Sequence, residues 1–297
     1  MTDARATIER LASDLRALGV REGGVLLVHS SLSALGWVPG GPETVIQGLL
    51  TALGPEGTLL VPALSFATVT PEHPVFDVRT TPSCIGAIAE HFRTRPGSLR
   101  SVHPSHSVCG VGPRAHELLA NHDVDRTPVG PNSPFRRLRA VGGQLLFLGC
   151  GMGPNTSMHG VEEVAQAPYL FRPDTVAYSI TRQDGSVLRA THRRHGFGGY
   201  TQRYERLEGL LGERMRSRPF WAAVRQAYTA LTGGRHDAAL ARTLFNSMSR
   251  RFFLTEGVAP ALECHESGQA VGGDPDCPGE LRPLPAGVDA FEAWRLA

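Results

Sequence analysis

The chain has 297 residues, of which 41% are hydrophobic and 20% charged, and its formal net charge is +2. This length is enough for one large α/β domain with a sizeable core, and the near-neutral charge does not indicate a dedicated nucleic-acid binder. No apolar run reaches 18 residues, so the sequence predicts no membrane-spanning helix. All 30 basic residues are arginine, which removes lysine from the candidate bases and Schiff-base formers.

The cysteines and the N-terminus indicate the compartment. The five cysteines are odd in number, and the first three sit in apolar or glycine-rich surroundings. Such a pattern favours reduced thiols in a cytoplasmic protein over a disulfide framework. Residues 1–22 are polar with helical periodicity, unlike a signal peptide.

The N-terminal part predicts a strand-helix-strand unit. An amphipathic helix is expected over residues 4–18, followed by a buried strand over Gly24–His29, a helix over Glu43–Leu53 and a strand over Thr58–Pro62. The small residues of the loop Ser30–Gly41 would let backbone N–H groups approach an anion. The loop matches neither the Walker nor the dinucleotide-binding pattern, so an ordinary connection is an equal alternative.

Residues 63–112 combine a long loop with polar groups. The stretch 63–82 lacks periodicity and predicts an ordered loop, after which Ser83 is expected to cap a helix over Cys84–Phe92. His103 and His106 lie among hydroxyl groups next to the apolar run 108–112. They predict a lined pocket, with zinc ligation or simple loop closure as alternatives.

The stretch NTSMHGVEE, residues 155–163, carries the clearest chemical signal. It follows an apolar strand over Gln144–Cys150, which places it at the carboxyl edge of a parallel sheet, where ligands bind. Asn155, Thr156 or Ser157 can cap the helix that follows. His159 and Glu162 are three positions apart and share a helix face, as a general base and its orienting carboxylate would. The alternative is a hydrogen-bonded structural histidine beside a solvated carboxylate.

The C-terminal part predicts additions to this sheet. An antiparallel hairpin is expected over residues 175–191, followed by helices over 204–216, 221–232 and 237–253. The predicted fold is therefore an α/β domain over residues 1–258, with a mostly parallel sheet, an added hairpin and C-terminal helices. Residues 259–297 form a tail rich in Gly and Pro. Cys264, His265 and Cys277 in this tail lack the spacing of a zinc site, and no metal is expected.

A series of short motifs, in order over roughly residues 5–255, resembles the aminoglycoside 3-N-acetyltransferase family. The motifs are His29-Ser30-Ser31-Leu32, Leu35-Gly36, Phe76-Asp77, Thr81-Pro82, Gly86 with Glu90 and Arg93, Pro96-Gly97, Arg100-Ser101, His103-Pro104, His106-Ser107, Ser133-Pro134, and Asn155-Thr156 with His159 and Glu162. The resemblance implies an α/β/α sandwich and acetyl-CoA as donor. It also implies direct transfer to an amine, in the first place the 3-amino group of a 2-deoxystreptamine aminoglycoside, as in antibiotic resistance.

The resemblance also implies roles for particular residues. The family histidine that acts as base corresponds to His159, its orienter to Glu162, and Asp77 and Glu90 are further acidic candidates. The groups expected to bind the donor, including Ser107 near the reacting carbonyl, are Ser30, Ser31, Leu32, Ser33, Ser107, Thr156 and Ser157.

Three alternatives to this function stay open. The arginines of residues 189–218 would suit an anionic amine in biosynthesis if they faced the site, or would form a solvated surface if they did not. A zinc-dependent hydrolase would use His103, His106 and His159 with Asp77. A protein that binds CoA without catalysis is the third. Neither a nucleic-acid nor a membrane partner is expected, and the chain is predicted to be a monomer or a homodimer.

Overall fold

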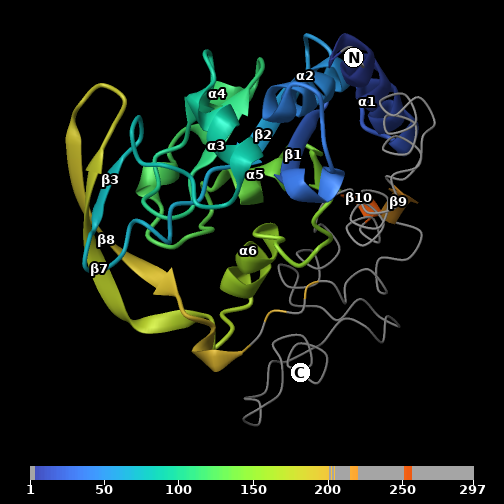
Figure 1. The fold of residues 1–297 in the computed structure, drawn as a ribbon. Helices are drawn as coiled ribbons and strands as arrows, with labels where there is room; N and C mark the ends of the chain where they lie inside the picture. Colours follow the sequence, from blue (N-terminus) through green and yellow to red (C-terminus); the bar gives the residue numbers. More distant parts are fainter. Residues whose placement is uncertain (1–3, 201, 203, 205–214, 220–250, 256–297) are drawn as a thin grey trace, which may run out of the picture.

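The computed structural model describes residues 4–200, 202, 204, 215–219 and 251–255, and it shows a mixed α/β fold with two sheets (Figure 1). The larger sheet has the strand order β4-β5-β2-β1-β6-β10-β9, and the smaller one has the order β3-β7-β8. The strands are β1 (Val25–Ser30), β2 (Thr58–Pro62), β3 (Val75–Asp77), β4 (Leu99–Arg100), β5 (Val108–Val111), β6 (Gln144–Leu148), β7 (Phe171–Thr181), β8 (Val187–His195), β9 (Met215–Pro219) and β10 (Arg251–Thr255). The α-helices are α1 (Ala4–Leu18), α2 (Gly41–Leu53), α3 (Ala87–Thr94), α4 (Ala115–Leu119), α5 (Pro134–Ala140) and α6 (Ser157–Val164). Short 3₁₀ helices cover Leu32–Leu35, His122–Val124 and Phe197–Gly199.

The centre of the larger sheet consists of three parallel strands. Val25–Leu27 of β1 pair with Thr58–Leu60 of β2, and Leu26–Ser30 of β1 pair with Gln144–Leu148 of β6. These three apolar runs confirm the strands that the sequence predicts. Because α2 connects β1 to β2, the predicted strand-helix-strand unit is present, and the carboxyl ends of all three strands meet at one edge.

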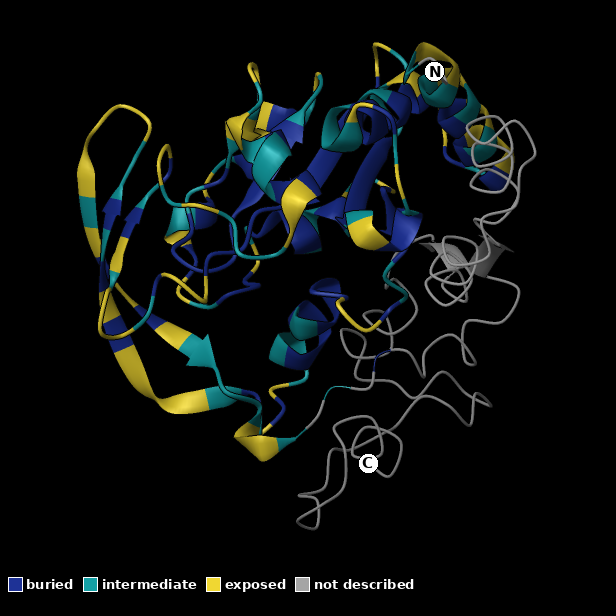
Figure 2. Ribbon diagram, in the orientation of Figure 1, coloured by how far each residue is buried: buried dark blue, intermediate teal, exposed yellow. Residues whose placement is uncertain are grey.

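Helices cover both faces of the central strands, so the α/β/α sandwich is confirmed. Alternate side chains of a strand point to opposite faces. Leu26 and Val28 pack in a core with α1, α2 and α3, whereas Val25 and Leu27 pack in a second core with α4, α5 and α6. Figure 2 shows the consequence, with the central strands and the inner sides of the helices buried.

The edges of the larger sheet are antiparallel, so the predicted parallel arrangement holds only at its centre. β5 pairs with β2, and β10 pairs with β6, in antiparallel register. The helices predicted over residues 204–216 and 237–253 are wrong where they overlap β9 and β10. The short apolar run at residues 252–254 fits the periodicity of a helix or of a strand. Pairing with the open edge of β6 satisfies its backbone hydrogen-bonding groups as a strand. The rest of these two helices, the helix over 221–232 and the tail lie outside the described residues.

The smaller sheet contains the predicted hairpin and one strand that the sequence did not predict. β7 and β8 are antiparallel, with Thr181 opposite Val187 at the turn. β3 comes from the predicted loop 63–82 and pairs in parallel with the end of β7. Phe76 of β3 is completely buried in a separate core with Tyr178 and Ile180. β3 has only three residues, too few to show the alternation of a strand in the sequence, so its pairing with β7 could not be predicted locally.

The helix α3 begins later than predicted. It starts at Ala87 after Gly86, and no side chain caps it. Ser83 instead donates its backbone N–H to Glu90 Oε2 at 2.7 Å, so it is held by the helix rather than capping it. The irregular chain before α3 thereby remains ordered without extending the helix.

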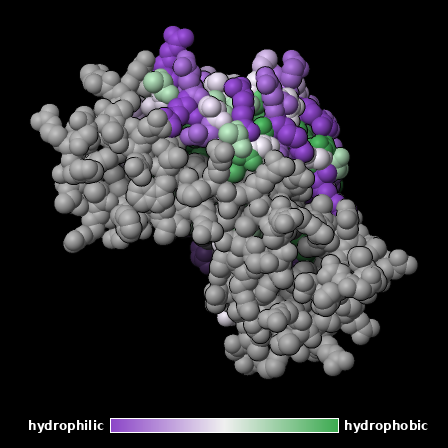
Figure 3. Space-filling view, turned by 90° about the vertical axis from the view of Figure 1, so that its right-hand side faces the viewer, coloured by the Kyte–Doolittle hydropathy of each residue, from purple (hydrophilic) through white to green (hydrophobic). Residues whose placement is uncertain are grey.

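The outer surface around α1 is mainly hydrophilic. Figure 3 shows mostly hydrophilic side chains among the described residues on this face, and α1 carries i,i+4 ion pairs between Arg5 and Glu9 and between Arg10 and Asp14. Within the described part of the chain, no helix is both long enough and apolar enough to cross a membrane. Of the predicted thiols, Cys109 is buried, and burial raises its pKa to about 12.

Gly112, directly after β5, should tolerate no side chain. Its φ is +124°, and an added Cβ would lie 2.2 Å from the carbonyl oxygen of Gly57. We expect Gly112→Ala to lower the free energy of unfolding by about 2–6 kcal/mol, through backbone strain and overpacking of about 1–3 kcal/mol each. Gly142 is the matched control, because its φ is +60° but nothing lies within 4 Å of an added Cβ. Urea unfolding of both variants tests this, and an equal loss in the two would contradict it.

Candidate active site

A cavity of about 260 Å³ opens at the carboxyl ends of the central parallel strands. Its wall combines the ends of β1 and β2 with the loop before α6 and two residues beyond β8. The lining residues are Val28, His29, Ser30, Val61, Pro62, Leu64, Phe66, Ile85, Ala89, Gly153, Pro154, Thr156, His159, Gln202 and Tyr204. The cavity therefore occupies the edge where open α/β sheets bind ligands.

The loop between β6 and α6 carries His159 to this cavity. β6 ends at Leu148, and α6 begins at Ser157 after the Gly- and Pro-containing turn. Of the three candidate caps, Asn155 makes the contact, because its Oδ1 accepts a hydrogen bond from Ser157 N at 3.2 Å. Thr156 occupies the cap position but makes no capping bond with its side chain. The cap holds the first turn of α6, on which His159 lies.

His159 is held through one ring nitrogen by a buried carboxylate and a tyrosine. Its Nδ1 lies 3.2 Å from Glu162 Oε2 and 2.8 Å from the hydroxyl of Tyr204. The Tyr204 hydroxyl donates to the same carboxylate oxygen at 2.6 Å, and Tyr169 donates to Oε1 at 3.2 Å. This network fits a tautomer with the proton on Nδ1, which leaves the lone pair on Nε2.

Both tyrosines donate their hydroxyl proton to Glu162, and the Tyr204 hydroxyl oxygen also accepts from His159 Nδ1. Burial, together with the negative charge of Glu162, raises the pKa of Tyr169 and Tyr204 far above the usual value. Both hydroxyls therefore keep their protons at any working pH and remain hydrogen-bond donors to Glu162. A fixed carboxylate below the imidazole orients the ring toward one tautomer, as in other base-orienter pairs.

His29 is a second histidine in the cavity wall and was not among the predicted site residues. Its ring stacks on Phe147, with centroids 5.3 Å apart and planes 6° from parallel. Burial, with a smaller contribution from His159, lowers its pKa to about 3, so the ring is neutral. Its Nε2 is buried and has no hydrogen-bond partner within the described part of the chain. The signal in the sequence is a polar residue at the end of an otherwise apolar strand.

His106 and His195 lie beside His159. The ring of His195, from the end of β8, is 5.1 Å from that of His159, and the ring of His106, from the loop after β4, is 6.3 Å from it. Burial, with the neighbouring histidines, lowers the pKa of both far below the usual value. His195 Nε2 also lies 2.8 Å from Glu163 Oε1. No spacing in the sequence relates His195 to His159, because they come from different elements.

The residues expected to bind the donor are only partly at the cavity. Ser30 and Thr156 line it, and Ser31 and Ser33 follow in the adjoining loop with their hydroxyls 3.3 Å apart. Leu32 packs against the core instead.

Ser107 and Ser157 are both buried. The Ser107 hydroxyl donates to the carbonyl of Ala63 at 2.8 Å and accepts from Arg100 at 2.9 Å, so it already has structural partners. Ser157 Oγ has no hydrogen-bond partner among the described residues.

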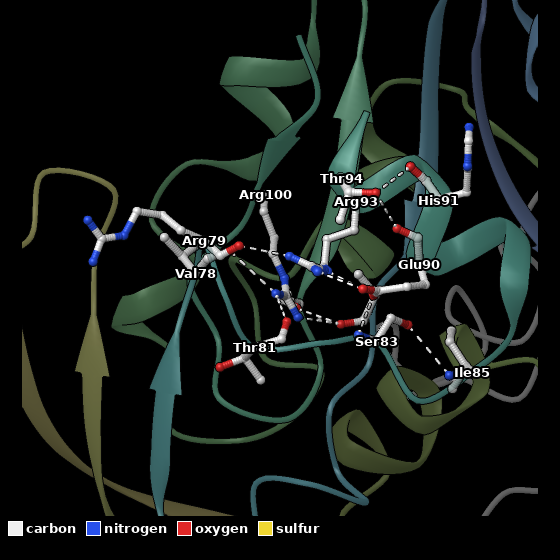
Figure 4. Close-up of polar contacts among 12 residues, drawn as sticks. Val78, Arg79, Thr81, Ser83, Ile85, Glu90, His91, Arg93, Thr94 and Arg100 are labelled. Carbon is white, nitrogen blue, oxygen red and sulfur yellow. Dashed lines mark hydrogen bonds and ion pairs between the residues drawn. The ribbon is translucent and has the colours of Figure 1, made fainter. Parts of the chain in front are cut away.

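Asp77 and Glu90, the further acidic candidates, form ion pairs outside the cavity wall. Asp77 accepts from the guanidinium of Arg79 at 2.8 Å, which lowers the pKa of the carboxyl. Glu90 pairs with Arg93 at 2.6 Å (Figure 4). Arg100, beside them in Figure 4, donates to the backbone carbonyls of Thr81 and Ala63, both in the segment 63–82. These contacts hold the segment before α3 in place.

The histidines that come together in the structure differ from the zinc ligands considered from the sequence. His103 stacks on His122 at 4.7 Å, and its Nε2 lies 3.1 Å from the carbonyl of Thr127. Its Nδ1 accepts the backbone N–H of His106 at 3.0 Å, so it closes the loop. Within the described part of the chain, the group that could hold a metal is His106, His159 and His195.

The arginines of β8 do not line the cavity. Arg189 and Arg193 are exposed, and Arg193 lies over the ring of Phe171 at 3.8 Å. They occupy the solvated side of the strand, while His192 occupies its buried side. The cavity wall contains imidazoles and hydroxyls but no arginine and no carboxylate among the described residues.

Comparison with known proteins identifies the family. The family model of the aminoglycoside 3-N-acetyltransferases matches residues 27–227, more than half of the chain. A second model, for the regulatory domain of isocitrate dehydrogenase kinase/phosphatase, matches only residues 200–271, most of which lie outside the described ranges.

Curated relatives and solved structures agree with the first model. Aminoglycoside N(3)-acetyltransferase VII of Streptomyces paromomycinus is 39% identical in an alignment of 184 positions that covers 56% of this chain and 64% of that protein. The type VIII enzyme of Streptomyces fradiae is 39% identical over 54% of this chain and 61% of its own length. The matched stretch thus spans less than two thirds of either relative. A histidine-to-alanine variant of aminoglycoside acetyltransferase AAC(3)-IVa, solved in complex with a gentamicin, superposes with a TM-score of 0.67 at 28% identity over 97% of this chain and 95% of that one. The chain belongs to the aminoglycoside 3-N-acetyltransferase family.

Proposed function

We propose that this chain transfers the acetyl group of acetyl-CoA to an amine of an aminoglycoside, with His159 as the general base. The observation that carries the proposal is the environment of His159 in the cavity wall. Its Nδ1 is held by Glu162 and Tyr204, which reserves the lone pair of Nε2 for a proton. Membership of the family supports the reaction, because its members are described as aminoglycoside 3-N-acetyltransferases.

The chemistry requires a base because an amine of ordinary pKa is mostly protonated at neutral pH. In the proposed step the ammonium form first releases one proton to solvent, and the neutral amine then attacks the thioester carbonyl while a second proton passes from its nitrogen to His159 Nε2. The tetrahedral intermediate then collapses, the carbon-sulfur bond breaks, and the departing thiolate of CoA takes the proton from His159. The hydroxyl of Thr156, which lines the cavity, is a candidate donor to the oxyanion.

The donor would lie along the end of β1 and the loop after it. Ser30 and Thr156 are at the cavity wall, and Ser31 and Ser33 continue this line at half-buried and exposed positions. Small hydroxyl residues let a pantetheine chain and a pyrophosphate approach the backbone closely. Leu32 and Ser157 would support this loop and the start of α6 from within the core.

The acceptor is proposed to be the 3-amino group of a 2-deoxystreptamine aminoglycoside. The solved relative AAC(3)-IVa carries a gentamicin, which supports this acceptor class. The alternative, an anionic amine, depends on arginines facing the site. Arg189 and Arg193 are exposed on β8, Arg194 is half-buried, and none of the three lines the cavity, which favours the aminoglycoside. The side chains of the later arginines up to residue 218 lie outside the described part of the chain.

Release of free CoA thiol from acetyl-CoA across a panel of amines tests the proposal. The panel holds several 2-deoxystreptamine aminoglycosides and several anionic amines, with isothermal titration of acetyl-CoA run in parallel. Turnover with aminoglycosides is the expected result. Turnover with anionic amines alone would replace the acceptor class, and bound acetyl-CoA without turnover of any amine would contradict the proposed activity.

Glu162→Gln should lower kcat while leaving acetyl-CoA binding unchanged. The amide keeps the volume of the carboxylate but cannot accept from both the imidazole and Tyr204 with a full charge. Misorientation of a catalytic group costs about 10²-fold, and we expect a loss of that order in kcat. Tyr204→Phe is the comparison variant, because it removes one donor but keeps the carboxylate, and its loss should be smaller. If the two variants changed kcat and KM by the same factors, the negative charge of Glu162 would have no orienting role of its own.

A further inference from the structure

Three histidines from separate parts of the chain converge at the cavity. His106 comes from the loop between β4 and β5, His159 from α6 and His195 from the end of β8. One ring nitrogen of each lies within 4.8 Å of one nitrogen of each of the others. The side chain of His195 is 3% exposed and that of His159 is 14% exposed. Three imidazole nitrogens gathered in a largely buried place form an array that a cation can ligate.

In each histidine of this group, one ring nitrogen already has a partner. His159 Nδ1 is held by Glu162 at 3.2 Å, and His195 Nε2 by Glu163 at 2.8 Å. His106 Nδ1 lies 2.8 Å from the hydroxyl of Ser105. Carboxylates and hydroxyls behind imidazoles are the usual outer shell of metal-binding histidines, since they fix the tautomer and the ring orientation.

The nitrogens left over point to a ligand. They are Nε2 of His106, Nε2 of His159 and Nδ1 of His195, and the last is buried with no hydrogen-bond partner in the described part of the chain. An unpaired buried polar atom costs free energy unless it meets a partner.

We propose that His106, His159 and His195 bind a divalent transition metal ion of the zinc class, with a fourth position open to water. Nitrogens that all lie within 4.8 Å of one another have a common centre no more than about 2.8 Å from each. Each ring would therefore move inward by at most about 0.7 Å to reach the ~2.1 Å of a zinc-nitrogen bond. The carboxylates of Glu162 and Glu163 behind the rings offset the charge of the ion.

Binding of this ion and acetyl transfer would exclude each other. The metal would occupy the lone pair of His159 Nε2 that accepts the proton of the amine. This inhibitory consequence rests on the proposed function, whereas the metal site itself does not. The inference differs from the sequence-based expectation of no metal, because no spacing in the sequence brings His195 to the other two.

Cobalt spectroscopy on the full chain, without a polyhistidine tag and after chelator treatment, tests the site. We expect one equivalent of Co²⁺ to produce visible bands of tetrahedral intensity, and Zn²⁺ to displace it. His106→Ala and His195→Ala should each weaken binding at least ~10-fold, and Glu163→Gln, which keeps the volume of the carboxylate, by about 10–100-fold. His116→Ala, at an exposed position away from the group, is the control and should bind as the unchanged chain does.

Two results would overturn the metal site. One is the absence of tetrahedral cobalt bands in the unchanged chain, or equal affinity in the three variants and the control. The other is a sulfur-to-cobalt charge-transfer band in the near ultraviolet, which would place the metal at cysteines such as Cys264 and Cys277. Near-ultraviolet circular dichroism of each variant establishes that it is folded.

Acetylation assays with and without Zn²⁺ test the metal site and the proposed function separately. With an aminoglycoside that is turned over, Zn²⁺ should inhibit the unchanged chain, and a chelator should restore the rate. For each variant, the rate with Zn²⁺ is divided by the rate of the same variant without Zn²⁺. This ratio should be closer to one in His106→Ala than in the unchanged chain, because the variant binds the ion more weakly. A chain that binds Co²⁺ through these histidines but acetylates no amine would support the metal site and contradict the proposed function.

Discussion

His159→Ala should lower kcat for acetyl transfer by about 10²–10⁴-fold, the usual contribution of a general base. The imidazole lines the cavity, and among the described residues no other imidazole in the cavity wall is held by a carboxylate. Affinity for acetyl-CoA should change little, because the base acts on the acceptor amine. Stopped assays of CoA thiol release with a turned-over aminoglycoside, together with calorimetric binding of acetyl-CoA, measure the two quantities separately.

The control and a double variant sharpen this experiment. His116→Ala changes an exposed histidine on α4 and should leave kcat unchanged. If Glu162 acts through His159, adding Glu162→Gln to His159→Ala should cause little further loss, because residues that work as a unit are not additive. Normal turnover in His159→Ala would rule out its role as base, and a full multiplicative loss in the double variant would give Glu162 a separate role.

Mild acid should destabilise the protein steeply. Six buried histidines have a lowered pKa, with burial as the main cause. The pKa is about 3 for His29 and His122, about 4 for His192, and well below the usual value for His103, His106 and His195. In the unfolded chain each would titrate near 6.5, so below this pH the unfolded state binds more protons than the native state.

The direction in which stability changes with pH follows from this difference in bound protons. The contribution of each histidine to stability is complete above pH 6.5 and is lost as the pH falls from 6.5 toward the folded pKa. One such group costs up to about 1.4 kcal/mol per pH unit. Asp125 and Glu163 act in the opposite direction, because burial raises the pKa of both and their protonation then favours the native state. Typical domains are stable by about 5–15 kcal/mol, so a fall of one to two pH units should suffice for unfolding.

Urea unfolding between pH 8 and pH 5, with a chelator present, measures this effect. The midpoint should change little above pH 7 and fall steeply below 6.5. His122→Gln should reduce the slope by about one proton, since the amide can replace the contact with Ser101 but does not titrate. His116→Gln, at an exposed position, should keep the slope of the unchanged chain. A midpoint independent of pH down to 5 would contradict the neutrality of the buried histidines.

The sequence by itself determined the parts of this protein that depend on local pattern. The apolar runs of β1, β2 and β6 and the periodicity of α1 and α2 predicted the central α/β unit, because burial imposes a period that a short window displays. The spacing of His159 and Glu162 predicted their contact for the same reason, since three positions on a helix share a face. The ordered motifs also identified the family.

Only the tertiary structure decided which distant groups complete the site. Tyr204 reaches the carboxylate of Glu162 from 42 positions away, and His195 reaches His159 from the end of a different sheet. β3 and β10 became strands because an open sheet edge was available to pair with them, a condition that no local window contains. Contacts between remote segments follow from packing and topology, and a local pattern records neither of them.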